Sequence, residues 1–249
     1  MIDFHSHVLP KLDDGAKSVE MSVAMLEASK AQGVTTVVCT PHYYGKSHSP
    51  ERFLEMRKAS YHRLAPNVPE GITLRLGAEV YFTEDMVVSY EDLSVLCIEG
   101  TRYIMIELPF TERYSERLFE KLEDFITESG CIPLIAHIDR YPAVLRKPKI
   151  LTRLMQMGCL LQMNVEAFTV KGIKGFAYAA LKKGVISAIG TDMHNVEERA
   201  PNMQSYLEAL QGLPAEIAET VAKTEAAILA GEWIPAQRKP VHKLFGKYF

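Results

Sequence analysis

The sequence predicts an α/β fold, a distorted βα barrel of about seven strands. Two observations lead to it. Short β-branched runs alternate with helix-like segments, and a glycine repeatedly separates a helix from the next strand. Parallel strands joined by helical crossovers give this order. Because we count seven candidate strands rather than eight, we expect an irregular or incomplete barrel, with a doubly wound open sheet as the structural alternative.

The candidate strands are short runs of apolar and β-branched residues. They cover residues 2–4, 35–39, 73–76, 103–106, 132–136, 160–163 and 185–189.

Helical patterns fill the segments between these strands. We expect Ser18 to cap a helix that runs through Gln32 and is closed by Gly33. A second helix is expected over residues 115–128, with Gly130 as its stop, and shorter ones over 150–157 and 176–183. The apolar positions of the first helix, expected on one face, are Met21, Ala24, Met25, Ala28 and Ala31. Those of the second are Leu118, Phe119, Leu122, Phe125 and Ile126.

Composition narrows the function classes. The 249 residues are 47% hydrophobic and 24% charged, which fits one globular domain over 1–249 with a basic, aromatic tail at about 236–249. A net charge of −3 argues against nucleic acid as a partner. No apolar run approaches the roughly 18 residues that span a bilayer. We find no leader ahead of the first strand and no Cys-x-x-Cys pair, so we expect a cytoplasmic protein without disulfides.

Metal-ligating residue types follow six of the seven predicted strands. In a βα barrel the carboxyl ends of the strands meet at one rim, and in an open parallel sheet they share one edge. Five of the eight histidines lie at these ends, and alternation along a strand would point His5 and His7 the same way. The candidate ligands are His5, His7, Asp14, His42, Glu79, Glu107, His137, Asp192 and His194.

These donors exceed what one ion accommodates, since an ion takes about four to six ligands including water. We therefore expect two or three ions. Imidazole and carboxylate without thiolate suit Mn²⁺, Fe²⁺ or Zn²⁺, and the residues alone do not choose among them.

Six stretches within residues 1–200 carry a family resemblance: MIDFHSHVLPKLDDGAKS, CTPH, GAEVYF, YIMIELPF, PLIAHIDRY and GTDMHN. Together they resemble the PHP (polymerase and histidinol phosphatase) superfamily. Within it they are most similar to the manganese-dependent bacterial protein-tyrosine phosphatases of capsule and exopolysaccharide operons. The resemblance implies a PHP-type, TIM-like barrel of about seven strands and Mn²⁺ as the cofactor. It also implies a phosphotyrosine protein as the substrate, expected to be the tail of a bacterial tyrosine kinase.

The resemblance also implies a partition of the ligands among three ions. His5, His7, Glu79 and Asp192 would hold the first ion, Glu79, Glu107 and His137 the second, and Asp14, His42 and His194 the third. Many family members have histidine where this chain has Asp14, and Asp13 beside it leaves the assignment ambiguous. Asp14 could instead serve only the turn Asp13-Asp14-Gly15, and Glu107 could be a surface acid.

Four residues are assigned catalytic roles. Arg140 and Arg199 look like the arginines that grip phosphate, and Asp192 and His194 join them as metal ligands. Pairing of Arg140 with Asp139 or with a helix end is the structural alternative. Metal-activated hydroxide would attack the phosphoryl group, and the arginines would add bidentate hydrogen bonds. The sequence names no general acid.

Aromatic residues follow several of the rim positions. They could wall a phenol ring or simply pack the loops, and they are Tyr43, Tyr44, Phe82, Phe110 and Tyr141.

Other functions remain open at this stage. The main alternative is a histidinol-phosphate or other small-molecule phosphatase of the same superfamily, and a nuclease or a non-catalytic metal-containing regulator are further alternatives. A cysteine-based tyrosine phosphatase is excluded, because no cysteine precedes an arginine by six residues. The tail could dock on a partner, another subunit or an anionic membrane surface, or be a loose terminus. The sequence gives no oligomeric state.

Overall fold

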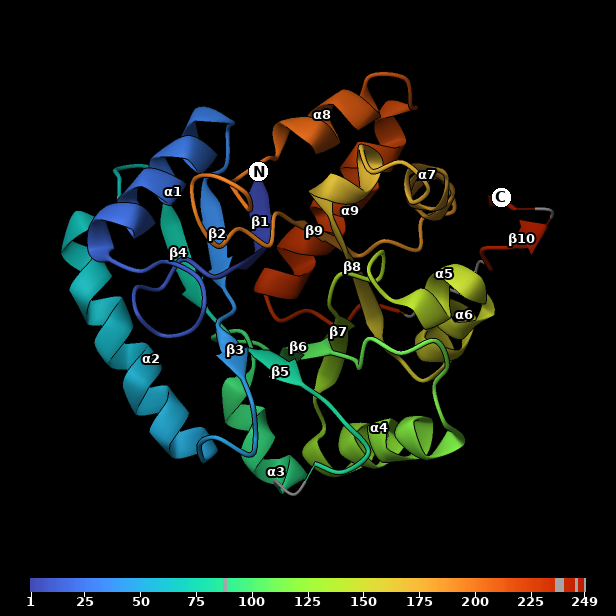
Figure 1. Ribbon diagram of the computed structural model, residues 1–249, viewed down its shortest axis with the longest axis horizontal. Helices are drawn as coiled ribbons and strands as arrows, with labels where there is room; N and C mark the ends of the chain where they lie inside the picture. Colours follow the sequence, from blue (N-terminus) through green and yellow to red (C-terminus); the bar gives the residue numbers. More distant parts are fainter. Residues whose placement is uncertain (87–88, 236–239, 245, 249) are drawn as a thin grey trace.

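The computed structural model describes residues 1–86, 89–235, 240–244 and 246–248. The strands up to residue 190 lie in the middle of the molecule with the helices around them, whereas the strand at Lys243–Leu244 lies at the edge near the C-terminus (Figure 1). A strand lies within or overlaps each of the seven segments that the sequence predicts, which confirms their positions. The strands are β1 (Ile2–Ser6), β2 (Thr36–Cys39), β3 (His42–Tyr43), β4 (Thr73–Leu76), β5 (Glu79–Tyr81), β6 (Tyr103–Glu107), β7 (Ile132–Ile135), β8 (Leu160–Asn164), β9 (Ala188–Gly190), β10 (Lys243–Leu244) and β11 (Lys247–Tyr248).

The central strands form a curled parallel sheet. Six of them, in the order β3-β5-β6-β7-β8-β9, make a half-barrel, and β1-β2-β4 form a smaller parallel sheet beside it. A parallel bridge between Ser6 and Met193 connects β1 to the segment after β9. Two backbone hydrogen bonds reinforce it, from His7 N to Met193 O (2.9 Å) and from Asp192 N to His5 O (2.8 Å). The carboxyl ends of these parallel strands therefore face the same way.

Two of the predicted strands are longer than expected but broken. After β2 the chain passes through Thr40 and Pro41 and resumes as β3, and after β4 it passes through Gly77 and Ala78 and resumes as β5. The resumed strands pair in parallel, with His42 opposite Glu79. Proline has no N–H to donate to a strand ladder, which accounts for a break at Pro41. The breaks were not predicted, and each one places a candidate ligand at the start of the resumed strand.

Helices form the outer layer. The predicted cap Ser18 is confirmed, because its Oγ accepts from Met21 N, and Gly130 ends α4 as expected. Ser115, expected inside the second helix, is its N-cap, and its Oγ accepts from Leu118 N. The second and the last of the long helices were not predicted. The helices are α1 (Val19–Ala31), α2 (Pro50–Leu64), α3 (Tyr90–Leu93), α4 (Glu116–Ser129), α5 (Pro142–Arg146), α6 (Lys149–Gln156), α7 (Lys174–Lys182), α8 (Gln204–Leu210) and α9 (Ala215–Leu229). Short 3₁₀ turns lie at Ala65–Asn67, Ser94–Leu96 and Val165–Phe168.

The buried face of α1 differs from the expectation. Ala24 and Ala31 are exposed, and the buried residues are Ser22, Met25, Leu26 and Ser29. Ser22 and Ser29 can lie inside because each hydroxyl donates to the carbonyl four residues earlier. Exposing an alanine costs little hydrophobic free energy, because its side chain is small. The pattern of alanines therefore predicted the wrong buried face for α1.

A bulge in β1 brings two kinds of residue into the same interior. The register with β2 shifts between Asp3 and Ser6. Phe4 packs in an apolar cluster with Val38 and Met105, while the next residue, His5, already lies among polar side chains. A bulge re-aims a side chain in this way.

The C-terminal tail is partly described. Arg238, Lys239, Phe245 and Phe249 lie outside the described residues. Of the remainder, Lys243 Nζ and Tyr248 Oη both donate to the carbonyl of Leu145, at 2.9 and 2.8 Å. This part of the tail therefore packs on α5 of its own chain. Within the described residues, no helix has both the length and the apolar character needed to cross a membrane.

Candidate metal centre

The structure brings all nine candidate ligands together at the carboxyl ends of the central strands. Eight have buried or largely buried side chains, and Asp14 alone is exposed, at 65%. The other three histidines, His48, His62 and His242, are exposed. Three sets of ligand atoms each lie within 4.8 Å of one another: His7, Asp14, His42 and His194; His5, His7 and Asp192; and His42, Glu79 and Glu107.

Glu79 lies at the middle of the cluster. Its Oε2 is 3.3 Å from His5 Nε2, 3.4 Å from His7 Nε2 and 2.9 Å from His42 Nδ1. Its Oε1 accepts from His137 Nε2 at 2.8 Å. One carboxylate facing four imidazoles is suited to bridging cations.

The second carboxylate from the sheet interior is Asp192. Its Oδ1 lies 3.5 Å from His5 Nε2 and 3.4 Å from His7 Nε2. The residue has a φ of +55°, in the left-handed region that non-glycine residues rarely adopt. His137, with a φ of +27°, is similarly strained, and its Nε2 lies 3.4 Å from Glu107 Oε1. Such backbone is held only where surrounding contacts require it.

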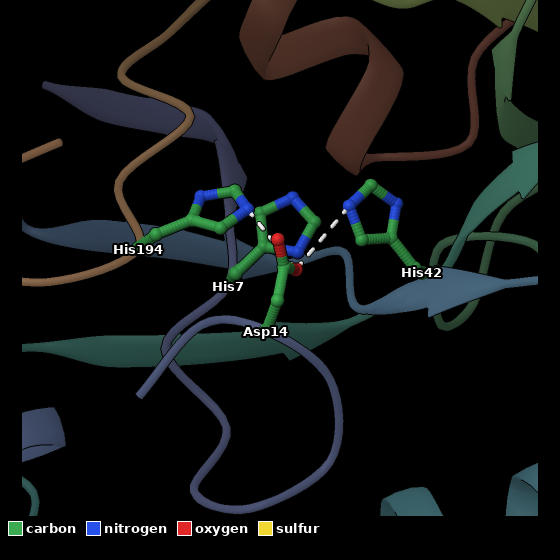
Figure 2. A group of neighbouring side chains, drawn as sticks. All are labelled: His7, Asp14, His42 and His194. Atoms are coloured by element: carbon green, nitrogen blue, oxygen red, sulfur yellow. Dashed lines mark ion pairs between the residues drawn. The ribbon is translucent and has the colours of Figure 1, made fainter. Parts of the chain in front are cut away.

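Asp14 reaches into the cluster from the loop after β1. Figure 2 shows its carboxylate between two imidazoles, with His7 behind it. Its Oδ1 is 3.5 Å from His42 Nε2 and 3.4 Å from His194 Nε2.

Asp13 and Asp14, which the sequence left ambiguous, have different positions. Asp13 Oδ2 accepts from His7 Nδ1 (2.7 Å) and from His42 N (3.0 Å), and its Oδ1 accepts from Gly15 N (2.9 Å). Asp13 therefore supplies the turn chemistry and orients His7, so that Nε2 of His7 faces the cluster. Gly15 is required here, because a Cβ at this position would lie 2.1 Å from the carbonyl oxygen of His7.

The donor atoms fit divalent cations better than they fit one another. Buried atoms without a hydrogen-bond partner in the described structure include His42 Nδ1, Glu79 Oε2 and His194 Nε2. His42 Nδ1 and Glu79 Oε2 are only 2.9 Å apart, yet they are not aligned for a hydrogen bond. Buried polar atoms are costly when unsatisfied, so atoms that converge without pairing indicate a site for a ligand.

The electrostatics agree with a cation site. Burial raises the pKa of Glu79 and Asp192, but the neighbouring histidines outweigh it and hold both pKa values well below their usual range. Burial lowers the pKa of His137, whereas its hydrogen bonds with Glu107 and Glu79 raise it to about 10. Burial and the charge of His7 lower the pKa of His194 to about 4. The carboxylates therefore stay ionised, and the histidines around them carry protons that a cation would replace.

Both predicted arginines contact the cluster through Asp192. Arg140 Nη1 and Arg199 Nη2 lie 2.9 and 2.6 Å from Asp192 Oδ2, and each side chain is about two-fifths exposed. Asp139, the alternative partner of Arg140, is buried, and its Oδ1 accepts from Asn164 N instead. The guanidinium groups thus present free N–H donors at the rim.

A hollow of about 330 Å³ opens over the cluster. Arg140, Arg199 and three aromatic residues, Tyr44, Tyr81 and Phe110, help to line it. Of the five aromatic residues that the sequence placed near the rim, Tyr44 and Phe110 therefore line the hollow. Tyr43, Phe82 and Tyr141 are instead buried in the core.

Sequence reasoning missed three contributors. Tyr81 lines the hollow because β5 continues past Glu79. Asp3 is fully buried, and its Oδ1 accepts from Thr191 N at 2.8 Å, which anchors the turn that carries Asp192. An acidic residue inside an apolar strand was the available signal for Asp3. The third contributor is a pair of amides on β8, Gln162 and Asn164. The available signal was the presence of two amide side chains in an otherwise apolar run.

Comparisons with known proteins identify the family and support the fold. The model of the family "Capsular polysaccharide synthesis, CpsB/CapC" matches residues 1–225. The tyrosine-protein phosphatase CpsB of Streptococcus pneumoniae is 33% identical over 213 residues, covering 82% of this chain and 87% of that protein. The tyrosine-protein phosphatase YwqE of Bacillus subtilis is 29% identical over 257 residues, covering 99% of each.

A solved structure extends the match to three dimensions. It comes from work on YwqE of Bacillus subtilis and CpsB of Streptococcus pneumoniae, described as unique metal-dependent tyrosine phosphatases. The TM-score is 0.82 at 27% identity, over 98% of this chain and 100% of that one.

Proposed function

This chain belongs to the CpsB/CapC family of capsular polysaccharide synthesis, and we propose that it is a metal-dependent phosphatase that hydrolyses phosphotyrosine on a protein. The resemblance drawn from the sequence motifs is confirmed at the level of the family. The observation that carries the proposal is the convergence of nine donor side chains beneath an open hollow with two arginines at its rim. The names of the relatives, tyrosine-protein phosphatases, support the substrate class.

We propose two or three divalent ions, Mn²⁺ first and Fe²⁺ or Zn²⁺ as alternatives. One ion would be held by His5, His7, Glu79 and Asp192, a second by Glu79, Glu107 and His137, and a third by Asp14, His42 and His194. The contacts of Glu79 with His5, His7, His42 and His137 support a bridging role for this carboxylate. The absence of thiolate among the donors favours metals that accept nitrogen and oxygen.

The chemistry divides between the ions and the protein. When bound, the ions neutralise the phosphate dianion and lower the pKa of a bound water, which supplies the nucleophile. Arg140 and Arg199 would bind the phosphoryl oxygens, since guanidinium N–H pairs match them in geometry and charge. Phe110, stacked near Arg140 at 5.3 Å, and Tyr44 would flank the phenol ring of the substrate.

The proposal also covers the fold, the expected protein substrate and the cellular location. We propose that the two parallel sheets act together as one distorted seven-stranded PHP-type barrel, and that residues 1–249 form a single phosphatase domain. The bridge between Ser6 and Met193 supports the closure. The expected substrate is the tail of a bacterial tyrosine kinase in the cytoplasm, where unpaired cysteines such as the four of this chain are usual.

The experiment is phosphate release from a phosphotyrosine peptide, a phosphoserine peptide and histidinol phosphate, side by side. Each is measured with Mn²⁺, with chelator and with His42→Ala, and His62→Ala on the exposed face of α2 is the matched control. We expect Mn²⁺-dependent release from phosphotyrosine that chelator and His42→Ala abolish and His62→Ala does not. Preference for histidinol phosphate would contradict the proposed substrate class. Absence of phosphate release from all three substrates would contradict the proposed phosphatase activity.

A further inference from the structure

The strand β8 is the exception among the seven predicted strands, because it supplies none of the nine candidate ligands, and the acidic residue that follows it, Glu166, is exposed. The strand carries amides instead. Leu160, Gln162 and Asn164 alternate along one face of the strand. Leu160 belongs to the apolar cluster, whereas Gln162 and Asn164, 0% and 3% exposed, lie at the depth of the candidate ligands.

Gln162 contacts two of those ligands through one oxygen. Its Oε1 accepts from the backbone N–H of His137 (2.6 Å) and from Nδ1 of His5 (3.3 Å). The second contact places the proton of His5 on Nδ1. Its Nε2 is then left as a lone pair facing His7, Glu79 and Asp192. The first contact holds His137 in its strained backbone conformation.

Asn164 extends the network to Asp192. Gln162 Nε2 donates to Asn164 Oδ1 (3.0 Å), which orients the second amide, and Asn164 Nδ2 donates to Asp192 Oδ2 (3.1 Å). Arg140 and Arg199 contact the same Oδ2. With Oδ2 occupied, Oδ1 of Asp192 is the oxygen that faces His5 and His7.

The neighbouring strand leaves room for this pair. At Gly190 of β9, a Cβ would lie 2.5 Å from Cβ of His5 and 2.9 Å from Nε2 of Gln162. No side chain larger than glycine fits there without displacing one of them.

We propose that Gln162 and Asn164 are positioning residues of the metal centre. Gln162 selects the tautomer of His5 and supports His137, and Asn164 selects the oxygen of Asp192 that meets the ion. When the arginines turn from Asp192 to bind phosphate, Asn164 is the donor that stays on Oδ2. This inference rests on the proposed function, since it assumes that the cluster binds metal.

The test is Mn²⁺ affinity, measured by competition with a fluorescent chelator on folded protein and without any substrate. We expect Gln162→Leu to weaken Mn²⁺ binding about 10–100-fold, which is the usual effect of losing a partner of a ligating histidine. Gln162→Glu keeps the acceptor for His5 and His137, so we expect it to restore most of the affinity. Met163→Leu, on the opposite face of the same strand and equally buried, is the matched control and should bind as the wild type does.

A second variant covers the case in which Gln162→Leu does not fold. Asn164→Ala removes only the donor to Asp192, and we expect it to weaken Mn²⁺ binding by about tenfold. Wild-type affinity in a folded Gln162→Leu or Asn164→Ala protein would overturn the inference while leaving the proposed function intact. A wild-type protein that binds none of Mn²⁺, Fe²⁺ and Zn²⁺ would overturn both.

Discussion

On β6, Met105 packs in an apolar cluster with Phe4 and Leu134, whereas Glu107 on the same face lies among histidines. On β8, Leu160 belongs to that cluster, and Gln162 and Asn164 bind the candidate ligands. The interior therefore has an apolar base and a polar upper layer built from the same strands, about 7 Å apart along each strand.

The two layers differ in whether the interactions of their side chains are satisfied within the protein. The base is satisfied by burial, and Ile228 of α9 belongs to the same cluster. The upper layer leaves His42 Nδ1, Glu79 Oε2 and His194 Nε2 without hydrogen-bond partners. The base therefore contributes stability by itself, while the upper layer holds a cost that a bound cation would relieve.

The largest expected effect comes from neutralising the centre of the upper layer. Glu79→Gln keeps the shape of the side chain but removes the charge that faces four imidazoles. We expect Mn²⁺-dependent phosphatase activity to fall by about 10³-fold or more, because the carboxylate proposed to bridge the ions is lost. Phosphate-release kinetics measure it, with the exposed Glu70→Gln as the control. Activity within tenfold of the wild type would contradict a bridging role.

A substitution in the apolar base should lower stability and leave metal binding unchanged. Leu134→Ala leaves a cavity in the apolar cluster, and we expect the free energy of unfolding to fall by about 2–5 kcal/mol. Mn²⁺ affinity per folded molecule should stay unchanged, since Leu134 belongs to the apolar base and is not a candidate ligand. Denaturant unfolding and chelator competition on the same preparation check both parts. A large loss of metal affinity in the folded variant would show that the two layers are not separable.

The upper layer should also link metal binding to pH. Hydrogen bonds to carboxylates raise the pKa of His7 and His137 against the effect of burial, so both histidines hold protons at neutral pH in the metal-free protein. Because a ligand imidazole must be neutral, Mn²⁺ binding releases these protons and tightens as the pH rises. We expect up to about tenfold tighter binding per pH unit for each proton released, between pH 6 and 8. Calorimetry in buffers of different ionisation enthalpy counts the protons, and a Kd independent of pH would contradict the linkage.

The smallest effect concerns Glu225, a buried acid beneath the rim. Burial raises its pKa to about 8, and its Oε1 accepts from Ile189 N at 2.9 Å. The folded protein thus keeps a proton that the unfolded chain has released, so stability falls as the pH rises from about 4.5 to about 8. Glu225→Gln cannot ionise, and we expect it to reduce the stability lost between pH 5 and pH 9 by about 1–3 kcal/mol.

Unfolding of metal-free protein across this pH range measures that effect. Glu219→Gln, exposed on the same helix, is the control and should follow the wild-type curve. A Glu225→Gln protein that loses as much stability as the wild type would contradict the assignment.

The sequence by itself determined the positions of the seven strands, the N-cap of α1, the glycine that ends α4, and the set of residues that meet at the rim. These are local signals, because β-branched runs, capping serines and strand-end histidines act through their immediate neighbours in the chain. The motifs also determined the family. The sequence did not reveal the buried face of α1 or the helices α2 and α9, whose places depend on what packs against them.

Only the tertiary structure decided how the rim residues divide their roles. It separated Asp14 at the cluster from Asp13 behind His7, and it placed both arginines on one oxygen of Asp192. It also brought the amides of β8 against His5, 157 residues away in the sequence. These assignments depend on distances between strands that the order of residues does not encode, so no local pattern could have supplied them.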